Sequence, residues 1–473
     1  MVDNNVENKI DIFEPRSENV TVVQTDSGAK DGQSKCLRCG ATDIALNIES
    51  GKLRCNSCRH ELELEKFEKS VTDLRGLDGT IIGSGASDIN ASAEDVLTLK
   101  CTSCGAEVVV DTSESLQSRC HWCRNTLSIK QQIPNGAVPD KVLPFTIKRD
   151  DAKTSIEKFV NDRSFFAHKK FKEEFCTENV MGVYLPYMVV DVNCEASFSG
   201  QGEILIRKYT SEDTTYYDAD LYDVSRDFDL IVENLTIESN VEKLSHRSSE
   251  RTNNIVNAIK PFDTENSVRW NANFIRGFTS QKRDTDIEDL SNLIDVKTVD
   301  IARHQVLKTI DKFDRGVSWT KQQVDIKGSQ WKAAYLPIWL YSYQHNNVIH
   351  YVAANGRNLN TMGSIPINKW RLFMVSLIVQ ILGTIPGLHI IALDFDLNFT
   401  GLIFFASGPF FFWQIYQRYR NRKARYKHES AANSSAENLQ SSENLLRRIR
   451  RTRRSSVQNR NDSAVNYKGG DSK

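Results

Sequence analysis

The sequence has no excess of charge of either sign, because 61 lysine and arginine residues balance 61 aspartate and glutamate residues in a chain of 473. Overall charge therefore gives no bias toward nucleic acid or any other highly charged partner. The first residues contain no basic start followed by an apolar run, so we expect no cleavable signal peptide. A chain of this length is too long for one small module, which predicts several domains.

The motifs of several large enzyme classes are also missing. The sequence contains no G-x-x-x-x-G-K-[ST] phosphate loop, which argues against a P-loop ATPase or helicase motor. It contains neither H-E-x-x-H nor G-x-S-x-G, the motifs of zinc proteases and of serine hydrolases. A site built from residues far apart in the sequence would escape this search. We therefore expect a non-enzymatic protein with no small-molecule substrate, and an undetected enzyme or transport accessory is kept as an alternative.

Charge is absent from two long stretches near the C-terminus. Residues 372–393 and 397–416 contain no Asp, Glu, Lys or Arg, and each stretch has about the twenty residues that a helix needs to cross a bilayer. Trp413 and Tyr416 lie near the end of the second stretch, where interfacial aromatic residues gather. The sequence therefore predicts a C-terminal two-helix transmembrane hairpin over residues 372–416.

Basic residues flank this predicted hairpin on both sides. Lys369 and Arg371 precede it, lysines and arginines follow it between Arg418 and Lys427, and the turn at residues 394–396 has none. Because basic residues gather on the cytoplasmic side, we expect a multi-pass protein of the cell membrane with two spans, cytoplasmic N- and C-termini and the lipid bilayer as a partner. A buried hydrophobic hairpin of a soluble protein is the alternative.

Eight of the ten cysteines form four Cys-x-x-Cys pairs. Each pair presents two thiolates from one tight turn, so two pairs complete a tetrahedral shell of four sulfurs. Such a shell leaves no open position for water, which predicts structural metal and a reducing compartment. Redox use is the alternative, but it would be expected beside a βαβ pattern. We expect two structural Zn²⁺ sites, whose ligands are Cys36, Cys39, Cys55, Cys58, Cys101, Cys104, Cys120 and Cys123.

The two sets of cysteines belong to copies of one unit. Every cysteine of the first set has a counterpart 65 residues later, and so do Gly40 and Arg59. Glycine after the second cysteine permits a backbone conformation in which amides point at sulfur. An alternating apolar pair follows each last cysteine, as expected of a short strand that covers the metal. The sequence therefore predicts two tandem zinc ribbons, which are small β domains, over residues 35–65 and 98–131.

Residues 138–367 have the aromatic and β-branched content of a packed cytosolic α+β domain with an antiparallel sheet. Helices are predicted over residues 150–162 and around 299–313. Tyr-Leu-Pro occurs at 184–186 and again at 335–337, in each case after a predicted helix. An internal duplication is one interpretation, and chance recurrence of three residues is the other. The remaining segments are a disordered N-terminus (1–34), a linker (66–97) and a basic disordered tail (417–473).

The tail contains a cluster of six arginines within ten residues, 445–454. One interpretation is a disordered solubilising tail, and the other is a segment that binds anionic lipid head groups or nucleic acid. Beside a predicted membrane hairpin, lipid is the better candidate. The arginines are Arg447, Arg448, Arg450, Arg451, Arg453 and Arg454.

Several segments together resemble a family. With the ribbons, Val142-Leu143-Pro144-Phe145, residues 182–187, residues 334–339 and the apolar C-terminal stretch in view, the chain resembles the bacterial membrane proteins described as TFIIB-type zinc-ribbon-containing. The resemblance covers roughly Cys101 to Tyr416. Most members have no assigned molecular function, and the ribbon is a scaffold that serves many unrelated roles. The resemblance therefore implies no residue roles beyond the eight zinc cysteines.

These observations predict a multidomain protein whose function is a membrane-anchored cytosolic zinc-ribbon adaptor or scaffold, non-enzymatic, that organises protein partners at the inner face of the membrane. Ribbon edges and a β-rich domain suit protein contacts. The first alternative is a membrane-tethered nucleic-acid-binding protein, supported by the arginines of the ribbons and the tail. The ribbons also contain acidic residues, so their positive field is modest.

Overall fold

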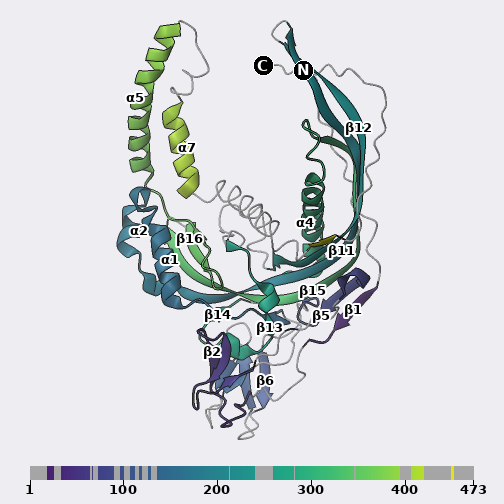
Figure 1. Cartoon of the computed structure of the whole chain (residues 1–473). Helices are drawn as coiled ribbons and strands as arrows, with labels where there is room; N and C mark the ends of the chain where they lie inside the picture. Colours follow the sequence, from purple (N-terminus) through teal and green to yellow (C-terminus); the bar gives the residue numbers. More distant parts are fainter. Residues whose placement is uncertain are drawn as a thin grey trace.

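The computed structural model describes residues 19–25, 34–63, 67, 73–89, 96–100, 107–111, 117–119, 126–128, 136–211, 214–239, 259–281, 283–345, 348–394, 406–419 and 449–451. Their framework is an 11-stranded mixed sheet. Figure 1 shows that this sheet bends into a deep curve, with helices at both ends and the small sheets that contain β2 and β6 below its middle.

Three long antiparallel strands form the centre of the curved sheet. They are β11 (Met181–Ser211), β12 (Thr214–Glu238) and β15 (Val317–His345), and β11 pairs with both of the others. Residues 183–192 of β11 are buried without interruption, as expected for a strand that is covered on both faces. The β11–β12 register shifts near Val190 and Leu205, and irregularities of this kind bend and twist a sheet.

Short strands complete the sheet, in the order β1-β5-β15-β11-β12-β18 along its main path. Two of them, β1 and β5, lie in segments that the sequence assigned to a disordered N-terminus and a linker. They pair in parallel with each other, and β5 pairs with β15. The short strands are β1 (Val20–Val23), β5 (Gly79–Gly83), β10 (Lys141–Val142), β13 (Val268–Arg269), β14 (Thr279–Ser280), β16 (Val348–Asn355), β17 (Thr361–Gly363) and β18 (Ile449–Arg451).

The two Tyr-Leu-Pro segments lie opposite each other in the sheet. Tyr184 of β11 pairs with Pro337 of β15, Leu185 with Leu336, and Pro186 with Tyr335. The antiparallel register is therefore symmetrical about the Leu185–Leu336 pair. A helix precedes each long strand and a hairpin follows it, so the sequence order helix, long strand, return strand occurs twice, as a duplication requires.

Five α-helices are assigned within the described residues: α1 (Arg149–Asn161), α2 (Lys169–Glu174), α4 (Ile287–Leu307), α5 (Lys369–Asp394) and α7 (Ser407–Tyr419). α1 forms where the sequence predicts it and buries Ala152, Ile156, Phe159 and Val160. α4 begins earlier and ends earlier than the helix predicted around 299–313. Short 3-10 helices are η1 (Leu74–Gly76), η2 (Ser164–Phe166), η3 (Thr177–Asn179), η6 (Thr264–Asn266) and η7 (Ala272–Phe274).

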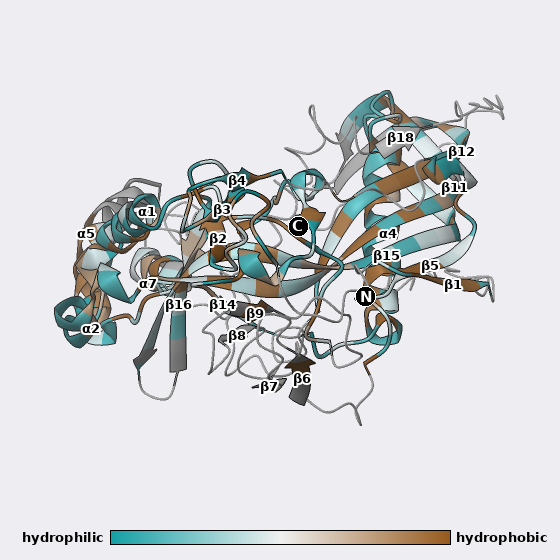
Figure 2. Cartoon of the chain, turned by 90° about the horizontal axis from the view of Figure 1, so that it is seen from below, coloured by the Kyte–Doolittle hydropathy of each residue, from teal (hydrophilic) through white to brown (hydrophobic). Residues whose placement is uncertain are grey.

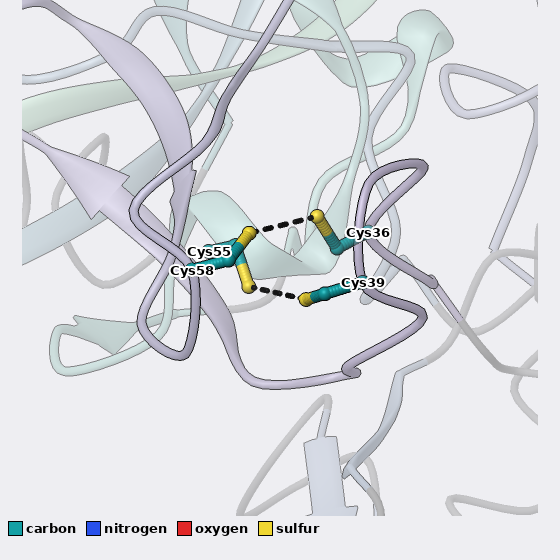
Figure 3. Close-up of side chains that lie close together, drawn as sticks. All are labelled: Cys36, Cys39, Cys55 and Cys58. Atoms are coloured by element: carbon teal, nitrogen blue, oxygen red, sulfur yellow. Dashed lines mark hydrogen bonds between the residues drawn. The ribbon is translucent and has the colours of Figure 1, made fainter.

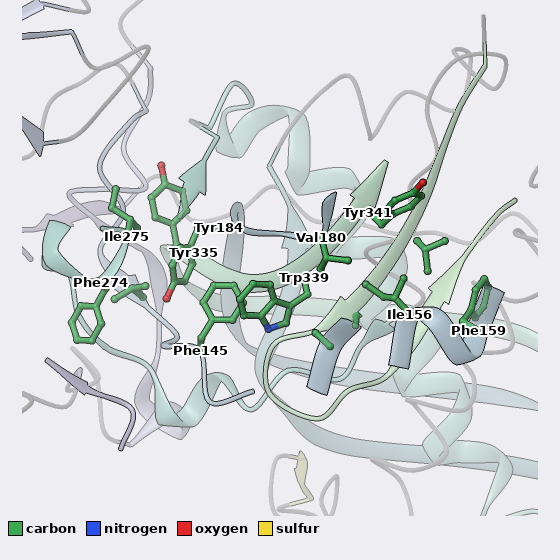
Figure 4. Close-up of a cluster of buried hydrophobic side chains, with 14 of the residues drawn as sticks. Phe145, Ile156, Phe159, Val180, Tyr184, Phe274, Ile275, Tyr335, Trp339 and Tyr341 are labelled. Atoms are coloured by element: carbon green, nitrogen blue, oxygen red, sulfur yellow. The ribbon is translucent and has the colours of Figure 1, made fainter. Parts of the chain in front are cut away.

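The two larger helices of the central domain cover opposite ends of the sheet (Figure 1). α1 packs over β16 and β17 in a cluster that includes Phe145, Tyr184 and Trp339, which we call the α1 core (Figure 4). α4 packs over β12 in a second cluster that includes Val192 and Ile294, which we call the α4 core. Each helix thus packs over the hairpin that belongs to the other half of the chain. In Figure 2, apolar and polar residues alternate along the long strands at the β12 end.

The predicted transmembrane hairpin over residues 372–416 is wrong. Within the part of the chain that the structure describes, no helix combines the length and apolar content that a membrane crossing requires. α7 has 13 residues, which corresponds to about 20 Å of helix against the ~30 Å of a hydrocarbon core. The predicted two-span localisation in the cell membrane is corrected with it, and the expected lipid partner rested on the same hairpin.

Part of the apolar content of this segment is used for packing within the protein. Leu372 at the start of α5 is fully buried, and Phe411, Ile415 and Tyr419 of α7 pack on or within the α1 core. α5 and α7 also contact each other at Gly408, whose amide donates to the Gln380 Oε1 at 2.9 Å. A β-carbon at Gly408 would lie 2.7 Å from the Ser376 carbonyl oxygen, so this close approach needs glycine.

Candidate metal centre

The first set of cysteines lies on a small antiparallel sheet. Its strands are β2 (Ile44–Asn47), β3 (Lys52–Cys55) and β4 (Glu61–Leu62), in the order β2-β3-β4. The turn between β2 and β3 contains Gly51 with a positive φ of 67°. Cys36 and Cys39 precede β2, and Cys55 and Cys58 lie at the turn between β3 and β4. The sheet thus brings together two tight turns that are separated in the sequence.

The two cysteine turns have the same backbone hydrogen bonds. The amide of Gly40 donates to the Cys36 carbonyl at 2.8 Å, and the amide of Arg59 donates to the Cys55 carbonyl at 2.9 Å. The residue after each second cysteine has a positive φ, 72° at Gly40 and 61° at Arg59. Glycine adopts this conformation without strain, whereas arginine does so at a cost. The glycine predicted to permit the turn is therefore at the left-handed position.

The four sulfur atoms form a compact group (Figure 3). The Sγ atoms of Cys36, Cys39, Cys55 and Cys58 all lie within 4.8 Å of one another. Cys36 and Cys58 are 3.6 Å apart, as are Cys39 and Cys55, which is far longer than a disulfide bond of about 2 Å. A tetrahedral metal with sulfur at about 2.3 Å requires sulfurs separated by about 3.8 Å. Four free thiols at this spacing can bind a metal ion.

Backbone amides around the site favour thiolates. A hydrogen bond with the backbone of Cys39 is the largest cause that lowers the pKa of Cys36, to about 7. Burial opposes ionisation of Cys55, but hydrogen bonds with the backbone of Cys58 and Ser57 outweigh it and lower that pKa. At Cys39 the backbone of Ala41 favours the thiolate, yet the neighbouring sulfurs raise the pKa to about 12. Four adjacent thiolates repel one another, so complete ionisation requires a cation among them.

The four-cysteine unit is fixed to the central domain by specific contacts. Ile44 and Leu53 of its strands are buried in the α1 core. Arg276 forms an ion pair with Asp43, and its Nη1 donates to the Ile44 carbonyl at 3.2 Å. The Lys148 Nζ forms an ion pair with the Oε1 of Glu49, in the turn between β2 and β3, at 2.6 Å. Sequence reasoning did not identify Arg276, because no local pattern links it to a segment so distant in the chain.

The predicted second set, Cys101, Cys104, Cys120 and Cys123, lies outside the described residues. One strand pair beside it repeats a pair of the first unit, since β8 (Gln117–Arg119) pairs with β9 (Thr126–Ser128) as β3 pairs with β4. Ser118 pairs with Leu127 there, as Leu53 pairs with Leu62 in β3 and β4, again at an offset of 65 residues. β6 (Val96–Lys100) and β7 (Glu107–Asp111) form the remaining hairpin. The second site stays a prediction.

Most of the predicted arginine cluster also lies outside the described residues. Arg450 and Arg451 belong to β18, which pairs with β12, and Arg447, Arg448, Arg453 and Arg454 are not described. No local pattern in residues 449–451 predicts a strand in the large sheet. Binding of these arginines to lipid or nucleic acid stays a prediction.

Comparison with known proteins gives one distant relative. No family model matches the chain, and no solved structure matches it. The chain is similar to the uncharacterized protein YdjG of Bacillus subtilis (strain 168), with 20% identity over 342 residues that cover 72% of this chain and 91% of that protein. The resemblance to TFIIB-type zinc-ribbon proteins therefore stays a prediction, and the chain is similar over most of its length to an uncharacterized bacterial protein.

Proposed function

We propose that this protein is a non-enzymatic zinc-ribbon adaptor that binds and organises protein partners. In this proposal both cysteine sets bind Zn²⁺ for structure. The central α+β domain holds the first ribbon and the α5–α7 pair in fixed positions. The four-cysteine centre supports the binding of zinc. An apolar surface on α5 and α7 supports the binding of a partner.

The four-cysteine centre supports zinc by its chemistry. An all-thiolate set selects soft or borderline metals, and a tetrahedral arrangement of four sulfurs is characteristic of Zn²⁺ or iron–sulfur sites. Four protein ligands fill the coordination of Zn²⁺, so this ion would stabilise the ribbon and would not bind a substrate. We expect about two Zn²⁺ per chain by elemental analysis. Cys36→Ser and Cys101→Ser should each remove about one, and a content near zero would contradict the assignment.

A continuous apolar stripe on α5 supports partner binding. Its exposed side chains recur at intervals of three and four residues, which places them on one face of the helix. Two exposed aromatic side chains of α7 lie on the helix packed against it. We call this set the α5–α7 apolar face: Trp370, Phe373, Met374, Leu377, Ile378, Ile381, Leu382, Ile385, Phe410 and Trp413. Contiguous exposed apolar surface marks interaction sites, and a helical stripe is typical of recognition through a helix or groove.

The test is affinity capture of the tagged full-length protein, with identification of the bound proteins. The variant Ile378→Asp with Leu382→Asp places charge in the middle of the apolar face. Its matched control is Thr154→Asp with Lys158→Asp, two exposed positions with the same spacing on α1. We expect specific proteins to be captured by the wild type and the control and to be lost from the first variant. Equal capture by all three would contradict partner binding through this face.

A nuclease-treated half of each sample tests the alternative of nucleic-acid binding. If the captured proteins persist after treatment, protein contacts hold the complex together. If recovery collapses and nucleic acid is the main species that co-purifies, the adaptor proposal fails and the tail arginines become the residues to mutate. Binding that falls steeply with salt would accompany that outcome.

A further inference from the structure

At its outer edge β12 pairs with a second strand, the short β18. Along one edge β12 pairs with β11 over its whole length. Along the other edge Leu230, Ile231 and Val232 pair in antiparallel register with Arg451, Arg450 and Ile449 of β18. The outer edge of a strand presents backbone donors and acceptors to which an extended segment can add. Here the added segment is part of the chain's own arginine-rich tail.

The two paired segments have opposite charge. β12 contains seven acidic residues and one basic residue, Arg226. Residues 445–454, which include β18, contain six arginines and no acidic residue. Arg226 does not offset the acidic edge, because it is buried on the α4 side, where its Nε donates to the Thr309 hydroxyl at 3.0 Å. Strand addition at this edge is thus favoured by charge as well as by backbone pairing.

Acidic residues of neighbouring strands meet on one face of the sheet. Phe228, Leu230 and Val232 are buried in the α4 core, so Asp227 and Asp229 point to the opposite face. On that face Asp229 of β12 pairs with Glu195 of β11, and Glu195 pairs with Asp325 of β15.

Three carboxylates therefore lie side by side across three neighbouring strands. Like charges in cross-strand pairs are destabilising. Lys327 lies 2.5 Å from Glu195, and this hydrogen bond is the largest cause that raises the lysine pKa, with a further contribution from Asp229. The environment thus stabilises positive charge. Arg450 lies opposite Ile231 in the register, between Asp229 and Glu233 along β12.

We propose that the outer edge of β12 is a docking strand for residues 449–451 of the same chain, which bind there by strand addition, so that the arginines of β18 are kept from other anionic partners. Backbone pairing at residues 230–232 fixes the register, and the acidic face beside it selects a basic segment. A polyanion that competes for the arginines would release the segment and expose the edge. This inference does not depend on the adaptor proposal, because it concerns a different surface and uses no partner protein.

Hydrogen exchange of the full-length protein tests the docking directly. Ile449→Pro removes a backbone donor from the added strand, and Val457→Pro in the same tail, outside the β18 register, is the matched control. We expect those amides of residues 229–233 that point toward β18 to exchange at least about tenfold faster in Ile449→Pro than in the wild type or the control, while the amides that point toward β11 stay protected. Raising the salt from about 0.1 M to about 1 M should accelerate exchange in the wild type. Equal exchange in all three proteins would overturn the proposal.

A peptide of residues 445–454 tests whether the acidic residues select a basic segment. It also tests whether the bound segment belongs to the same chain. Added to the full-length Ile449→Pro variant, the labelled peptide should bind, and Asp227→Asn with Asp229→Asn should weaken it about tenfold. The wild type should bind it more weakly than Ile449→Pro, since its edge is occupied. Equal binding to the wild type would overturn the proposal. Protection that depends on protein concentration would also overturn it, since the segment would then come from a second copy.

Discussion

The two ends of the curved sheet are built to the same plan and differ in what surrounds them. At one end α4 covers the β11–β12 hairpin, and at the other α1 covers the β15–β16 hairpin. The α5–α7 pair packs at the α1 end, and the four-cysteine unit joins the same core below the middle of the sheet, whereas the α4 end has the acidic face and the added strand β18. A scaffold with a similar order of elements at its two ends thus has different surfaces there, and perturbations at one end should leave the other end largely intact.

The α1 core is also the more aromatic of the two. The Phe145 ring lies 4.5 Å from that of Phe278 in a stacked arrangement, 4.9 Å from that of Trp339 and 5.0 Å from that of Tyr184 (Figure 4). Rings in such pairs add attraction beyond the burial of their surface. The α4 core relies more on aliphatic side chains such as Val192, Ile294 and Val299. The α1 end should thus depend on a few large residues.

Metal removal should have the largest effect on stability and should show that the two ends of the sheet unfold independently. Binding of structural Zn²⁺ is worth on the order of 10 kcal/mol to a ribbon, so chelation or Cys55→Ser should unfold the first ribbon. We expect faster hydrogen exchange in residues 44–62 and then at the α1 end, where Ile44 and Leu53 are buried. The α4 end is the internal control. Uniform loss of protection at both ends would contradict their independence.

Truncation of an aromatic ring should give the next largest effect. Phe145→Ala removes a fully buried ring that three other rings contact, which should cost about 3–5 kcal/mol of unfolding free energy. Ile294→Val in the α4 core deletes one methylene group and should cost about 1 kcal/mol. Denaturant unfolding measures both. A larger loss from Ile294→Val would reverse the ranking of the two cores.

Acidification should destabilise the β15–β16 hairpin through His350. Burial is the main cause that lowers the pKa of His350 to about 4, and the nearby His345 contributes. The folded state prefers the neutral ring, so His350 contributes fully to the free energy of unfolding above its unfolded pKa of about 6.5. This contribution is lost as the pH falls toward 4, and about 2 kcal/mol of it is gone at pH 5. Protection of β16 against exchange should fall over this range. His350→Gln should reduce the pH dependence of this protection. An unchanged pH dependence in the variant would show that His350 is not its cause.

The smallest expected change in stability comes from the backbone conformation of the two cysteine turns. Arg59 adopts the positive φ that Gly40 adopts in the other turn, so Arg59→Gly should relieve strain and stabilise the ribbon by roughly 0.5–1 kcal/mol. The measurement is the chelator concentration at which Zn²⁺ is lost, and Arg38→Gly is the control because its backbone is not at the left-handed position. Earlier metal loss in Arg59→Gly would indicate that the arginine side chain stabilises the turn.

The sequence predicted best what depends on local spacing. The first cysteine set and the left-handed glycine follow from patterns within a few residues. The two Tyr-Leu-Pro segments prove to be paired strands, and the duplication that they indicated stays a prediction. The hairpin at 372–416 was mispredicted because missing charge does not reveal what covers an apolar surface. Leu372 and Tyr419 are buried by residues distant in the chain. Arg276, which fixes the ribbon, and β18, which pairs with β12, are likewise set by tertiary contacts.

The symmetrical register at Leu185 and Leu336 has a consequence for how the two halves of the chain hold together. The register joins β11 of the first half to β15 of the second, and α1 and α4 each pack over the hairpin of the opposite half. The core of each half is therefore incomplete without the other. Fragments produced by cleavage between Glu238 and Ile259 should reassociate into one folded particle, and neither should fold alone.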